Sequence, residues 1–185
     1  MEMERIKLLT NEPRILTNDP SMTAWGWAVL SDSGEVFETG CIKTSPEQKK
    51  RRIRKGDDTI RRASEIIRQL IEIIKQYDIQ LILSELPHGS QNASAAVMIG
   101  LVTGIVQTLA DCFDLPIEWY SEGDAKKCAL NRLSATKGEI IERMITLYKS
   151  DWLSGTKYID ESIADALAIH HVASKTSSTL KMMRR

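Results

Sequence analysis

Two apolar segments of this 185-residue chain each end in a carboxylate, and this pattern constrains the fold more than any other feature of the sequence. Asp19 ends the segment Arg-Ile-Leu-Thr-Asn-Asp, Glu85 ends Leu-Ile-Leu-Ser-Glu, and Asp165 lies inside Ile-Ala-Asp-Ala-Leu-Ala-Ile. Because taking an unpaired carboxylate out of water is costly, acids at such positions are usually paired or bound to a metal. No lysine or arginine lies within three residues of Glu85 or Asp165. The three acids therefore predict a shared cation site.

The order of strand-like and helix-like segments predicts an α/β fold, in which a mixed five-stranded sheet is flanked by helices. Three strands come first as an antiparallel meander, and two further strands alternate with helices. The expected strands are residues 14–18, 24–30, 35–43, 80–86 and 116–121, and the expected helices are residues 57–77, 94–112, 136–153 and 161–174. Ligands favour the carboxyl ends of strands in such sheets. Asp19 and Glu85 are expected to be neighbours at that edge, and Asp165 can reach them from a late helix.

Length and composition indicate one compact domain, because a chain of this size buries roughly 70% of its unfolded surface. We expect an N-terminal arm over residues 1–13, the main domain over residues 14–174 and a basic C-terminal tail over residues 175–185. The formal net charge of zero excludes a protein that is basic overall, although charge can still be segregated locally.

The cysteines and the hydropathy of the chain indicate an intracellular protein. Cys41, Cys112 and Cys128 form neither a CxxC motif nor a Cys/His cluster, so a structural zinc site and a disulfide framework are not expected. The chain has neither a signal peptide nor an uncharged run of about 18 apolar residues. We therefore expect a soluble protein that does not enter a membrane.

Carboxylates in this arrangement suit hard divalent cations, because Mg²⁺ takes oxygen ligands. Two such ions about 4 Å apart can activate a water molecule and stabilise the leaving oxygen of a phosphodiester. Glu161 is a candidate fourth ligand, since residues four apart share one face of a helix and Glu161 precedes Asp165 by four. Asp160 is less well placed, because five residues carry it off that face. The alternative is that these acids are merely solvated at the ends of their elements.

Three motifs resemble those of a known family. The segments Ile-Leu-Thr-Asn-Asp-Pro-Ser-Met-Thr-Ala-Trp-Gly-Trp-Ala-Val (15–29), Ser-Glu-Leu-Pro-His-Gly (84–89) and Ile-Ala-Asp-Ala-Leu-Ala (163–168) resemble the signatures of RuvC-type Holliday junction resolvases, which belong to the RNase H-like superfamily. The resemblance spans about residues 14–174. It implies an RNase H-like nuclease domain, in which Asp19, Glu85 and Asp165 are catalytic carboxylates that bind Mg²⁺ or Mn²⁺.

Two positions depart from the family pattern. The family commonly has an acid or a histidine three residues before the last aspartate, where this chain has Ser162. Glu161 is therefore predicted to take over that role as a catalytic and metal-binding residue. The residue before the first aspartate is usually apolar, whereas this chain has Asn18, which could tune the site or hydrogen-bond the backbone.

A nuclease needs positive charge around its acidic centre, because Lys and Arg neutralise DNA phosphates. The segment 124–137 resembles the family stretch in which two lysines eleven residues apart flank a Gly-x-Gly turn. The predicted DNA-binding residues are the two matching lysines, Lys126 and Lys137, together with Lys127 and Arg132. Asn131 and Leu133 replace the glycines, and Asn131 can still adopt the left-handed turn conformation. The basic run 49–55 is either a further DNA contact or a solvated loop.

Residues 93–110 carry no charge and are apolar around almost the whole circumference of the expected helix. Such a helix is buried on all sides, which requires either the core of the domain or a partner subunit. Gly100 and Gly104 would let another backbone approach closely. The resemblance favours a homodimer, because RuvC-type resolvases pack through this region. Two active sites on a two-fold axis suit a four-way junction.

The sequence thus predicts a homodimeric, metal-dependent endonuclease that resolves Holliday junctions by paired symmetric nicks, through attack of a metal-activated water. One alternative is an RNase H-like nuclease that acts on flaps, forks or RNA–DNA hybrids. Another is a catalytically silent protein that binds branched DNA. A sugar-kinase-like phosphotransferase is remote, because no Gly-rich phosphate loop follows the first acid. We expect the protein in the cytoplasm of a bacterial cell or a phage-infected host.

Overall fold

Five strands form one mixed sheet in the order β3-β2-β1-β4-β5, in a computed structural model that describes residues 12–47 and 53–183. The strands are β1 (Arg14–Asp19), β2 (Ala24–Ser31), β3 (Val36–Lys43), β4 (Leu81–Glu85) and β5 (Ile117–Tyr120). β2 pairs antiparallel with β1 and β3, whereas β4 pairs parallel with β1 and β5. The predicted mixed five-stranded sheet and its opening meander are therefore confirmed.

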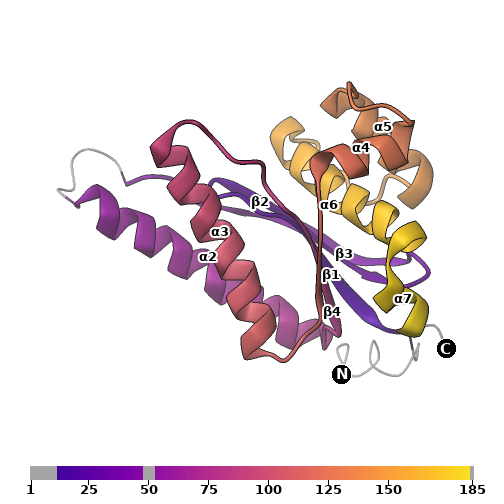
Figure 1. The fold of residues 1–185 in the computed structure, drawn as a ribbon, viewed down its shortest axis with the longest axis horizontal. Helices are drawn as coiled ribbons and strands as arrows, with labels where there is room; N and C mark the ends of the chain where they lie inside the picture. Colours follow the sequence, from indigo (N-terminus) through magenta and orange to yellow (C-terminus); the bar gives the residue numbers. More distant parts are fainter. Residues whose placement is uncertain (1–11, 48–52, 184–185) are drawn as a thin grey trace.

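Helices cover both faces of this sheet. They are α2 (Lys55–Tyr77), α3 (Ala93–Cys112), α4 (Glu122–Leu130), α5 (Lys137–Tyr148), α6 (Lys157–Thr176) and α7 (Ser178–Met183). Figure 1 shows α2 and α3 on one face of the sheet and α4, α5, α6 and α7 on the other. α6 is the helix that crosses the sheet itself, since it contacts every strand.

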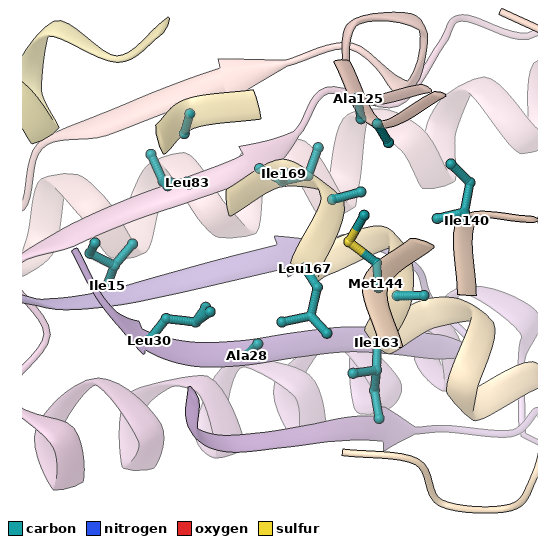
Figure 2. Close-up of a cluster of buried hydrophobic side chains, with 14 of the residues drawn as sticks. Ile15, Ala28, Leu30, Leu83, Ala125, Ile140, Met144, Ile163, Leu167 and Ile169 are labelled. Carbon is teal, nitrogen blue, oxygen red and sulfur yellow. The ribbon is translucent and has the colours of Figure 1, made fainter. Parts of the chain in front are cut away.

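Side-chain alternation along the strands divides the core into two layers. On β1, Ile15 faces the layer that contains α6, while Leu16 faces the layer under α2 and α3. On β4, Leu83 faces the layer that contains α6, and Ile82 faces the layer under α2 and α3. Figure 2 shows the α6 layer, in which Ile15, Ala28, Leu30 and Leu83 of the strands meet Ile163, Leu167 and Ile169 of α6.

One glycine lets α6 lie directly on the sheet. A Cβ atom added to Gly26 of β2 would lie 2.0 Å from the backbone oxygen of Ser162, a separation that real Cβ atoms essentially never show. The Ser162 hydroxyl also donates to the backbone oxygen of Ala24 at 3.3 Å. Because Gly26 pairs with Asp19 across β1 and β2, this close approach lies beside the strand end that carries Asp19.

Two boundaries expected from the sequence differ from the structure. The predicted helix 136–153 ends at Tyr148, because Lys149 has φ 63° and ψ −162°, a combination that no helix contains. The predicted basic tail 175–185 is partly helical: α6 continues to Thr176, and α7 follows. α7 packs on the domain because its Leu180 is an apolar side chain that is only 1% exposed, in the α6 layer.

Other expected segments fall outside the described residues. These are residues 1–11 of the predicted N-terminal arm and residues 48–52, which include Lys49, Lys50, Arg51 and Arg52 of the basic run.

α3 is packed on one side only. Its buried residues are Val102, Ile105, Val106, Leu109 and Ala110, whereas Val97 is 64% exposed. The interpretation of α3 as an internal core helix is therefore wrong for the single chain. By length and composition alone α3 could also cross a membrane, which corrects the expectation that the chain has no such segment; core helices of soluble proteins pass the same test.

Candidate functional site

The ends of β1 and β4 place two of the predicted acids side by side. Asn18 pairs with Ser84 in the parallel register of these strands, so the next residues, Asp19 and Glu85, end neighbouring strands at one edge. Because side chains alternate along a strand, both acids point to the face that α6 covers.

α6 brings Asp165 to the same edge. The charges of Asp165 and Glu85 both raise the pKa of Asp19, which means that the three carboxyls lie within electrostatic reach of one another. The Asp165 side chain remains 19% exposed, so solvent reaches the group. We call Asp19, Glu85 and Asp165 the acid cluster.

Burial and mutual repulsion favour the protonated forms of the acid cluster. Burial raises the pKa of Asp19 well above its ordinary value, and Asp165 and Glu85 raise it further. Burial, followed by the charges of Asp165 and Glu122, raises the pKa of Glu85 to about 7. Burial also raises the pKa of Asp165, although Lys137 opposes this shift. Such carboxyls gain more than ordinary ones from a cation that offsets their repulsion.

One lysine pairs with the acid cluster. Lys137, the first residue of α5, donates from Nζ to Oδ2 of Asp165 at 3.1 Å. Burial alone would lower the pKa of Lys137, but the charge and hydrogen bond of Asp165, and then the charges of Asp19 and Glu161, raise it overall. The sequence around Asp165 contains no partner because Lys137 is 28 residues away along the chain.

The donor set of the acid cluster fits a hard divalent cation. Its members are carboxylates, the ligand type that Mg²⁺ and Mn²⁺ take, and an ammonium group already lies beside Asp165. In the present side-chain conformations, no group of three His, Cys, Asp or Glu residues in the described part of the chain is arranged to hold a metal ion. The residues that would hold one are Asp19, Glu85 and Asp165.

Glu161, the predicted fourth ligand, acts on Lys137, and its role in metal binding stays a prediction. Its charge acts on Lys137, but it is not among the main contributors to the pKa of any member of the cluster. Ser162 uses its hydroxyl to donate to backbone oxygens of Ala24 and Tyr158. The Ser162 side chain is therefore hydrogen-bonded to backbone oxygens of β2 and α6.

α4 and, with it, Glu122 were not predicted from the sequence. One carboxylate oxygen of Glu122 accepts a hydrogen bond from Lys126 Nζ at 2.5 Å, and the other lies 4.0 Å from His88 Nε2. The charge of Glu122 raises the pKa of all three members of the acid cluster. The Lys126 hydrogen bond is the main reason that the pKa of Glu122 itself is lowered.

A sequence signal for α4 is present. Ser121-Glu-Gly-Asp follows the pattern of a capping box, and Ser121 and Asp124 make both of its hydrogen bonds. The predicted turn at Asn131 is also found, since Asn131 closes α4 with φ 57°.

The predicted DNA-binding residues differ in their surroundings. Lys126 and Lys137 lie at the acid cluster, because both lower the pKa of Glu85 and of Asp165. Lys127 is exposed on α4. Arg132 forms an ion pair with Glu139, the residue that also completes the capping box of α5.

Asn18 does not face the acid cluster. It is 1% exposed, and its Oδ1 accepts a hydrogen bond from Trp25 Nε1 at 3.0 Å. Both residues line the layer under α2 and α3, on the other face of the sheet.

Comparison with known proteins places this chain in a family. Residues 15–172 match the family model of the crossover junction endodeoxyribonuclease RuvC. A structure of T. thermophilus RuvC in complex with a Holliday junction substrate has a TM-score of 0.68 and 18% identity, and covers 86% of this chain and 92% of that one. A further structure, of Thermus thermophilus RuvC, has a TM-score of 0.64 and 20% sequence identity, and it covers the same shares of the two chains.

The yeast mitochondrial Holliday junction resolvase Ydc2 gives a TM-score of 0.63 at 12% identity, and covers 97% of this chain and 86% of that one. Comparison with curated proteins gives no match. At these identities the structural likeness speaks for the fold alone, and it confirms the RNase H-like α/β fold. Since the family model covers most of the sequence, the chain belongs to the RuvC family of crossover junction endodeoxyribonucleases.

Proposed function

We propose that this chain resolves Holliday junctions by paired, symmetric nicking, with the acid cluster as its catalytic centre. The observation that carries the proposal is the meeting of three acids from β1, β4 and α6 at one sheet edge, where burial raises the pKa of each. Membership of the RuvC family supports the same activity.

The acid cluster is proposed to hold Mg²⁺, for which Mn²⁺ can substitute. When bound, such ions supply the charge that activates a water molecule and stabilises the leaving oxygen of the phosphodiester. Asp19 and Glu85 offer their oxygens from the ends of paired strands, and Asp165 offers its own from α6. Lys137 keeps a positive charge beside Asp165, where a phosphate oxygen can meet it.

The DNA backbone is proposed to run over α4 and the start of α5. Lys126 and Lys137 lie nearest the acid cluster, and exposed Lys127 lies on the same helix as Lys126. Arg132 is an outer contact, because Glu139 already pairs with it. Phosphate contacts of this kind give affinity and orientation.

We further infer that a second copy of the chain covers the open face of α3. An added Cβ on Gly100 or Gly104 would meet nothing within 4 Å, so a backbone can approach there. A hollow of about 280 Å³ lies at this position, and its lining residues are Ile67, Gly100, Leu101, Gly104, Ile105, Thr108 and Leu109. A two-fold dimer would present two acid clusters to a junction whose cut strands are themselves related by symmetry.

The test is cleavage of a synthetic four-way junction, labelled on each strand, in Mg²⁺. The expected products are paired nicks at symmetry-related positions in opposite strands. The variant Asp19→Asn should bind the junction and leave it uncut. Cleavage that survives Asp19→Asn would overturn the proposal.

The same assay separates the other candidate activities. Preferential cleavage of flaps, forks or RNA–DNA hybrids would identify a different RNase H-like nuclease. Junction binding in EDTA, followed by no cleavage when Mg²⁺ or Mn²⁺ is added, would identify a catalytically silent DNA-binding protein.

A further inference from the structure

We propose that Glu122 supplies the fourth carboxylate of the cation site, a role for which the sequence favours Glu161. The inference rests on the proposed function, because it concerns the same site. Glu122 begins α4 directly after β5, and in β5 Tyr120 pairs with Glu85 of β4. The backbone N–H of Leu86 donates to the Tyr120 oxygen at 2.8 Å and extends this pairing past Glu85. Glu122 therefore approaches the acid cluster from the β5 edge.

Glu122 acts on the whole acid cluster. Its charge raises the pKa of Asp19, of Glu85 and of Asp165, whereas Glu161 is not a main contributor to any of them. Like charges held so close together repel unless a cation lies among them. Glu122 therefore adds negative charge to the acid cluster, which makes a bound cation more favourable there.

Two lysines pair with acids in this region. Lys137 Nζ lies 3.1 Å from an oxygen of Asp165, and Lys126 Nζ lies 2.5 Å from an oxygen of Glu122. Lys126 also lowers the pKa of Glu85 and of Asp165, so its charge acts on the same carboxyls as the charge of Lys137. Glu122 binds its ammonium group as Asp165 does, from a different helix.

The Glu122 side chain is partly exposed at the start of α4. It is 41% exposed, and its polar partners within the described residues are Lys126 and His88. Because a partly exposed ion pair contributes little to stability, Glu122 can exchange Lys126 for a bound cation at small cost.

Binding of Mn²⁺ to the full-length protein, measured by calorimetry without DNA, tests this assignment. Glu122→Gln should weaken Mn²⁺ binding about tenfold, the lower end of the range for loss of a group that supports a metal site. Glu161→Gln should leave the affinity unchanged. Glu142→Gln is the matched control, because Glu142 is an exposed acid on α5 and the substitution removes the same charge.

Lys126→Gln distinguishes a ligand from a residue that merely holds Lys126. If Glu122 is a ligand, Lys126→Gln removes a competing cation and binding is retained or tightened. An equal loss in Lys126→Gln and Glu122→Gln, a loss in Glu161→Gln instead, or no loss in Glu122→Gln would each overturn the inference. Thermal unfolding in EDTA identifies any variant that is simply misfolded.

Asp19→Asn separates this inference from the proposed function. If Asp19→Asn also leaves Mn²⁺ binding unchanged, the acid cluster is not the cation site and the proposed function fails with it. If Asp19→Asn weakens binding while Glu122→Gln does not, only the assignment of Glu122 fails.

Discussion

Among single residues, Asn18 and Asp19 are neighbours on β1 that lie in two different environments, one on each face of the sheet. Asp19 belongs to the acid cluster, yet Asn18 is buried on the opposite face, where it accepts a hydrogen bond from Trp25. A residue that looks like part of the site in the sequence is therefore part of the packing under α2 and α3. Alternation along the strand is the physical reason.

We expect Asn18→Leu to lower the free energy of unfolding by about 1–3 kcal/mol, because the buried indole N–H of Trp25 loses its acceptor. Urea denaturation in EDTA measures the change. The double variant Asn18→Leu with Trp25→Phe should recover part of the loss, since both polar partners are then gone. Unchanged stability combined with lost Mn²⁺ binding would show instead that Asn18 serves the cation site.

His171 should make the protein sensitive to acid. Burial, followed by the charges of Lys175 and Arg143, lowers the pKa of His171 from 6.5 to about 4. Its Nε2 lies 3.0 Å from Lys175 Nζ, a contact in which a neutral imidazole accepts. Because the unfolded chain binds the proton more readily, stability is fully present above pH 6.5 and is lost as the pH falls toward 4.

The variant His171→Gln should therefore flatten the loss of stability over this pH window, by up to roughly 3 kcal/mol. Urea midpoints measured at several pH values between 4 and 7 give the two slopes. Equal slopes for the wild type and His171→Gln would contradict the assignment.

At the scale of helices and strands, Gly26 determines how α6 sits on the sheet. We expect Gly26→Ala to destabilise the protein by about 3 kcal/mol, because an added methyl group meets the backbone of α6 rather than a flexible side chain. Thermal unfolding measures the loss. Gly138→Ala is the matched control in α5: its added Cβ meets nothing within 4 Å, so stability should be kept or raised by up to about 1 kcal/mol.

Elements with strong periodicity could be predicted from the sequence, and elements defined by local backbone chemistry could not. The apolar segments of β1 and β4, each ending in an acid, correctly placed Asp19 and Glu85 at one edge of the sheet. The end of α5 was missed because a left-handed Lys149 stops the helix, and no residue pattern requires that conformation of a lysine. α4 was missed because its nine residues are too few to show an apolar period. Its sequence signal is the capping box that begins at Ser121.

The site was predictable to the same extent. Acids at the ends of apolar strands stand out in a sequence, whereas the partners of those acids are determined by packing. Lys137 reaches Asp165 across 28 residues, and Glu122 reaches the cluster only because β5 lies beside β4. Neither relation has a local signal.

For the whole molecule, the open face of α3 predicts a partner subunit. Val97→Glu should convert the proposed dimer to a monomer and abolish paired nicking, because it places a charge in an apolar interface while the side chain is 64% exposed in the single chain. Analytical ultracentrifugation measures the change. Met182→Glu on α7 is the matched control, since that side chain is 65% exposed and lies on the other face of the sheet. A dimer that persists in Val97→Glu would place the interface elsewhere.

The acid cluster joins residues from β1, β4 and α6, and this has a consequence during protein synthesis. A growing chain that ends before Lys157, where α6 begins, contains Asp19 and Glu85 but has neither Asp165 nor the helix that presents it. Such a chain holds two of the three carboxylates and cannot assemble the centre. We therefore expect DNA cleavage only after α6 has been synthesised and has packed on the sheet.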